Sequence, residues 1–134
     1  MWKELITSIG FGNVVVDTKV KKKQYQVGET ISGVVEIKGG MVRQEIESVI
    51  LTLVIQYEQD KEDSDFSYHQ KEIAEVMLNE VDFVQAKETI ILPFSMTIPL
   101  GHLRTTENTE TFLRTKLVIP YAVDAVDEDK IIIV

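Results

Sequence analysis

The stretch that decides the fold is Ile90-Ile91-Leu92-Pro93-Phe94-Ser95-Met96-Thr97-Ile98-Pro99-Leu100. Apolar side chains occupy every second position from Ile90 to Ile98, which is the periodicity of a β-strand with one wholly apolar face. Pro99 ends this strand because proline cannot donate a hydrogen bond to a neighbouring strand. Pro93 lies inside the strand, so its N–H side must face a sheet edge or a bulge. An apolar face of this kind needs a second sheet to cover it, and the pattern therefore predicts a β-sandwich.

The rest of the chain after Asn13 has the same strand-like character. Short alternating segments with turn residues between them are typical of a sandwich or barrel. The predicted strands cover residues 14–23, 31–38, 46–58, 66–77, 81–84, 90–98 and 112–119, and the last four residues are also read as a strand. Six side chains are expected to be buried between two antiparallel sheets: Val35, Leu51, Leu53, Leu92, Phe94 and Leu117.

A short helix is predicted at the N-terminus, over residues 2–9. Trp2, Leu5, Ile6 and Ile9 have the spacing of one helix face, and Gly10 and Gly12 follow as a stop. A helix this short is not stable alone, so we expect it to dock on the domain. With no repeat and no linker in the sequence, residues 1–134 are expected to form a single domain, a helix followed by a β-sandwich over residues 13–134.

Composition restricts the class of partner. The 134 residues carry 22 acidic and 14 basic side chains, a net charge of −8, which argues against non-specific binding to nucleic acid. The absence of cysteine excludes disulfides and thiolate chemistry. Neither a secretory signal nor an apolar run of about 20 residues is visible, so we expect a cytoplasmic protein without an integral membrane segment.

Metal sites and catalytic motifs are weakly represented. Asp60, Glu62, Asp63 and Asp65 are candidate calcium ligands in one predicted loop, although a solvated hairpin tip explains them as well. Asp124, Asp127, Glu128 and Asp129 are interpreted as a solvated turn. The two histidines, His69 and His102, lack zinc-ligand spacing and are expected to be structural or solvent-facing. No nucleophile elbow or dinucleotide fingerprint is present, so we expect no enzyme and no cofactor.

Two segments are candidates for contacts with other proteins. Lys19, Lys21 and Lys23 fall on one face of the first predicted strand, where they either protect a sheet edge or dock an acidic partner or phosphate. Ile131, Ile132, Ile133 and Val134 are apolar on both faces of the last predicted strand. An unpaired apolar strand is a template for another chain, so this segment either pairs within its own sandwich or joins two copies into a homodimer.

Several of these segments together resemble a known fold family, the arrestin-like sandwiches. The stretches that carry the resemblance are 25–37, 92–100 and 115–125. A narrower resemblance, to the bacterial sporulation-control, arrestin-like family, rests on Ser8-Ile9-Gly10-Phe11-Gly12-Asn13, on Ile37-Lys38-Gly39-Gly40 and on the acidic segment 124–129.

The resemblance implies the N-terminal half of a two-domain protein. It also implies a cytoplasmic, non-enzymatic regulator that binds other proteins in sporulation, stress or envelope regulation. The alternative that the residues leave open is an acidic β-sandwich module that binds calcium or another ligand.

Overall fold

The computed structural model describes residues 13–60 and 66–134, and all regular structure in them is β-strand. The strands are β1 (Val15–Val20), β2 (Gln24–Tyr25), β3 (Thr30–Lys38), β4 (Gln44–Glu45), β5 (Ser48–Asp60), β6 (Phe66–Leu78), β7 (Phe83–Val84), β8 (Thr89–Thr97), β9 (Thr109–Val118) and β10 (Ala125–Ile133). The all-β prediction is confirmed for this part of the chain. The helix predicted over residues 2–9 lies outside the described residues.

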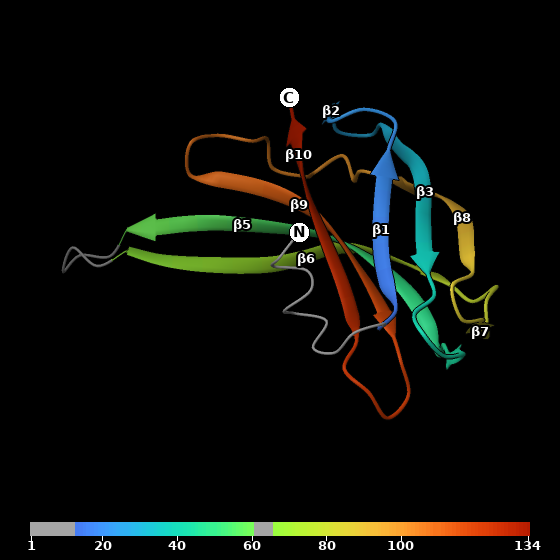
Figure 1. The fold of residues 1–134 in the computed structure, drawn as a ribbon. Coiled ribbons are helices and arrows are strands. Elements are labelled where there is room, and N and C mark those ends of the chain that lie inside the picture. The colour runs from blue at the N-terminus through green and yellow to red at the C-terminus, as the bar shows by residue number, and fades with distance from the viewer. Residues whose placement is uncertain (1–12, 61–65) are drawn as a thin grey trace.

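The strands form three sheets (Figure 1). One has the order β1-β3-β8, the largest has the order β2-β10-β9-β5-β6, and β4 and β7 form a small third sheet. All the pairs are antiparallel except β2–β10, which is parallel, so the prediction of wholly antiparallel sheets is wrong at this one place. Since β2 and β10 are more than 100 residues apart in sequence, no tight hairpin dictates their direction.

The two larger sheets share one hydrophobic cluster, to which both contribute the inward-facing positions of their strands. The six side chains predicted for the core are all buried there. Thr18 of β1 and Thr115 of β9 also meet in this interior, with their hydroxyl oxygens 2.6 Å apart. The alternation of apolar residues therefore identified the inner faces correctly.

Pro93 lies on an outer strand, where a residue without an N–H is tolerated. β8 is the outer strand of its sheet and pairs with β3 alone, with Pro93 opposite Val34. The missing N–H of Pro93 can therefore point to the free edge without the loss of a ladder hydrogen bond. The prediction that this proline marks an edge is confirmed.

The acidic segment near the C-terminus is the main correction to the predicted elements. Residues 124–129 were expected to form a solvated turn, but β10 already begins at Ala125. The turn comes earlier, around Tyr121, and the carboxylate of Asp124 accepts a hydrogen bond of 3.1 Å from the amide of Ile119 across it. The segment extends as a strand because its alternate positions pair with β9, from Ala125 opposite Leu117 to Ile131 opposite Thr111.

Candidate interaction surfaces

The predicted lysine face is not a row of free charges. β1 ends at Val20, so Lys21 and Lys23 lie beyond the strand, where the amide of Lys21 donates to the carbonyl of Ser32 over 3.1 Å. Lys19 is paired across the sheet with Glu36, at 3.0 Å, and this hydrogen bond raises the pKa of the Lys19 ammonium. The predicted first strand is therefore too long at its end, whereas a role of the three lysines in docking a partner stays a prediction.

The C-terminal segment is paired within its own sheet. Ile131 and Ile133 are fully buried, whereas Ile132 and Val134 are about two-fifths exposed. The amide of Ile132 donates to the carbonyl of Lys23 and the amide of Val134 to that of Tyr25, both over 2.8 Å. Of the two alternatives that the sequence left open, pairing inside the domain is the one observed in the structure.

The candidate calcium loop falls largely outside the described residues. This applies to Glu62, Asp63 and Asp65, while Asp60 is the last residue of β5 and its side chain is also outside the described part. Within residues 13–60 and 66–134, no three histidine or carboxylate side chains gather closely enough to hold a metal ion. The same ranges contain no helix long and apolar enough to cross a membrane.

Both histidines have local structural contacts. The ring of His69 on β6 stacks on that of Tyr57 on β5, with their centroids 5.3 Å apart. His102 is buried, with its Nε2 atom 3.1 Å from Oγ1 of Thr111. Burial lowers the pKa of His102, which keeps the imidazole uncharged at neutral pH. The Nδ1 atom of His102 has no hydrogen-bond partner among the described residues, so no carboxylate in that part of the chain orients this imidazole as in a catalytic triad.

An open hollow of about 440 Å³ lies beside His102, in the connection between β8 and β9. Its walls combine apolar side chains, from Val27, Leu100 and Leu103, with the cation of Arg104. Leu100 and Leu103 are largely exposed. Open hollows with exposed leucines are more typical of contact surfaces than of enclosed small-molecule sites.

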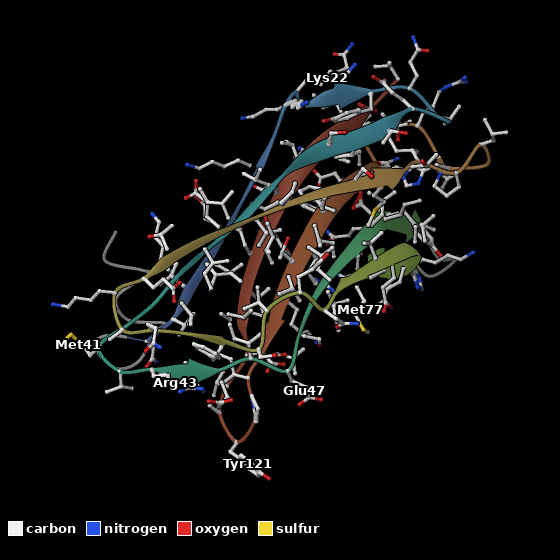
Figure 2. The ribbon with its side chains drawn as sticks, turned by 90° about the vertical axis from the view of Figure 1, so that its right-hand side faces the viewer. Lys22, Met41, Arg43, Glu47, Met77 and Tyr121 are labelled. Carbon is white, nitrogen blue, oxygen red and sulfur yellow. The ribbon has the colours of Figure 1, made fainter. Side chains whose placement is uncertain are left out.

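A second exposed surface lies at the opposite end of the molecule, and the sequence analysis missed it. We call it the apolar loop end and define it as Met41, Val42, Tyr121 and Val123, which are between 61% and 107% exposed. Figure 2 shows Met41 and Tyr121 at this end, with Arg43 between them, and Lys22 at the other. The signal in the sequence was the presence of large apolar residues inside turns, where polar residues are usual.

The backbone conformation at Tyr121 leaves its side chain exposed. Tyr121 has a φ of 60°, in the left-handed region that a bulky residue rarely adopts, and its side chain has no cover. At the same end of the molecule (Figure 2), Arg43 lies over the ring of Phe83, with the guanidinium carbon 4.0 Å from the ring centroid. The loop end thus combines exposed apolar groups with an aromatic–cation pair, a composition that is common in protein interfaces.

Three comparisons with known proteins agree on one family. The family model described as SpoOM protein matches residues 2–134. The chain is 32% identical to the sporulation-control protein spo0M of Bacillus subtilis (strain 168), over 98% of this chain and 51% of that protein. The crystal structure of Spo0M from Bacillus subtilis matches with a TM-score of 0.85 at 30% identity, over 93% of this chain and 50% of that one. The chain therefore spans about half the length of these relatives.

A more distant likeness concerns the fold alone. The CARDB domain of a Pyrococcus furiosus protein, solved in complex with di-metal ions, matches with a TM-score of 0.52 at 13% identity. That match covers 92% of this chain and 90% of the CARDB domain.

Proposed function

Because the chain belongs to the SpoOM protein family, we propose that it is a regulatory protein of arrestin-like type that acts in sporulation control through contacts with other proteins. We include in this proposal that residues 1–134 form a single arrestin-like β-sandwich domain, the N-terminal half of a two-domain protein. A non-enzymatic, cytoplasmic role is part of the same proposal.

The observation that best supports a binding role is the apolar loop end. Its four side chains come from two turns far apart in the sequence, after β3 and after β9, yet they reach the same end of the molecule. Scattered single apolar residues need no explanation, but a group on projecting turns is typical of a contact site for another protein.

The experiment is to replace Tyr121 and Val123 by serine in the native gene and to count spores. We expect sporulation to change while the protein is present at its normal level, because these side chains contribute no core packing. A matched control replaces the exposed pair Glu107 and Asn108 in another loop by serine. Normal sporulation in the Tyr121 and Val123 variant would contradict the assignment of this surface.

A homodimer through the C-terminal strand is a further part of the proposal. Since β10 pairs with β9 and β2 of its own chain, two copies would have to exchange this strand, with the turn around Tyr121 as the hinge. Light scattering across the micromolar range tests this idea. A monomer at every concentration would rule out the exchange.

A further inference from the structure

The seam between the two larger sheets brings two carboxyl groups against the edge of a strand. β1 is an outer strand of its sheet, and it lies beside β10 of the other sheet (Figure 1). Asp127 and Asp129 are two residues apart on β10, so both side chains point to the same face of the strand. Both are half-buried, whereas Glu128 and Lys130 between and beside them are exposed on the other face.

Asp127 takes the place of a backbone partner for the edge of β1. Its Oδ2 atom accepts a hydrogen bond of 2.8 Å from the amide of Thr18. The hydroxyl of Thr18 is 2.6 Å from that of Thr115, which lies opposite Asp127 in the β9–β10 ladder. Thr18 therefore binds to both β10 and β9. The Asp127 carboxylate accepts from a backbone amide at the outer edge of β1, where no neighbouring strand among residues 13–60 and 66–134 offers a carbonyl.

In the described part of the chain, one carboxyl oxygen of Asp129 is left without a partner. Its Oδ2 atom is buried and has no hydrogen-bond partner among the described residues. Burial, followed by the charge of Asp127 and a hydrogen bond to it, raises the pKa of the Asp129 carboxyl to about 7. Asp17 of β1 acts in the same direction, and Lys23 in the β1–β2 connection opposes them.

Apart from Asp17 and Lys23, the groups that face the pair are uncharged or paired. Opposite the two aspartates, β9 carries the uncharged Thr115 and Leu113. Lys19 on β1 is paired with Glu36. The seam therefore has more negative than positive charge, and a proton is what allows both carboxyl groups to stay close together.

We propose that Asp127 and Asp129 form a proton-dependent clasp between β1 and β10. In the protonated state, Asp129 donates its proton to the carboxylate of Asp127, which still accepts from the amide of Thr18. When Asp129 loses this proton, two like charges face each other in the half-buried seam. Their repulsion weakens the bond to Thr18 and loosens the edge strand β1.

Amide hydrogen exchange of the whole chain, measured by NMR, tests the clasp. The protection factor of the Thr18 amide should fall by about tenfold between about pH 6 and about pH 8. Linkage changes the closing equilibrium about tenfold for each pH unit below the closed-form pKa of about 7, and the change ends above that pKa. The amide of Leu51, in the interior strand β5, is the internal reference and should keep its protection. A carbon-detected titration should place the Asp129 carboxyl far above the ordinary aspartate range.

Two variants complete the test. In Asp129→Asn, the side-chain amide replaces the proton donor, so the protection of Thr18 should stay at its low-pH level throughout. Glu75→Gln removes one exposed charge on β6 and should behave like the parent chain. Normal titration of Asp129 near its ordinary value, or the same loss of Thr18 protection in Asp129→Asn, would overturn the clasp.

Discussion

At the scale of single residues, Phe94 offers the most direct test of the predicted core. It lies on β8 with 7% of its surface exposed and belongs to the cluster that both larger sheets share. Phe94→Ala should lower the free energy of unfolding by about 3–5 kcal/mol, because the cavity adds to the lost transfer energy. Urea denaturation measures this change. The neighbouring Ser95→Ala, on the exposed face, is the control and should have little effect.

His102 gives a pH prediction at the same scale. Burial lowers its pKa below the ordinary 6.5, so the folded state binds fewer protons than the unfolded state just below that pH. The contribution of His102 to stability is therefore present above pH 6.5 and is lost as the pH falls below it. His102→Gln keeps a polar contact for Thr111 and should reduce this loss, as seen in urea midpoints on the two sides of pH 6.5.

Asp129 has the opposite dependence and must be separated from His102. Its raised pKa means that the folded state holds a proton that the unfolded state has lost, so this contribution to stability falls as the pH rises from 3.8 to about 7. The His102 comparison is therefore made in the Asp129→Asn background. An equal loss of stability at acid pH with and without His102→Gln would show that the imidazole is not the group responsible.

At the scale of elements, the last residues of β10 contribute to the core more than to a contact surface. A chain that ends at Lys130 loses the buried Ile131 and Ile133 and the hydrogen bonds to the carbonyls of Lys23 and Tyr25. Truncating one such buried side chain costs about 2–5 kcal/mol, so the shortened chain should melt well below the intact one. Circular dichroism on heating measures this difference. Equal melting temperatures would mean that the segment is not packed as described.

The strands show where sequence reasoning succeeds and, in β10, where it fails. Alternation alone identified the inner faces of β3, β8 and β9, because burial on one face leaves a period of two. In β5 the predicted inward residues are buried, but Thr52 and Val54 on the other face are buried as well. The segment 124–129 was misjudged because a run of acidic residues usually means solvation. Its strand character depends on partners distant in sequence, Thr18 on β1 and the facing residues of β9.

At the scale of the whole molecule, sheet order and surface could not be derived from one sequence. The pairing of β5 with β9 joins segments about 60 residues apart, and no local pattern specifies such neighbours. The apolar loop end likewise exists because two turns that are far apart in sequence lie at the same end of the molecule (Figure 2). Periodicity reports which face of an element is buried, whereas it contains no information on which loops become neighbours.

The last prediction concerns the choice between a regulator and a calcium-binding module. The candidate calcium loop includes Lys61 and lacks the ligand order of an EF-hand. The net charge of −8 attracts cations only diffusely. Calcium should therefore leave the melting temperature unchanged once ionic strength is matched with sodium chloride. A specific site would behave differently, since ligand at about 100 times its Kd stabilises a fold by about 2.7 kcal/mol. Such a rise with calcium, absent with magnesium and lost in Asp63→Asn, would favour the calcium-binding module over the regulator.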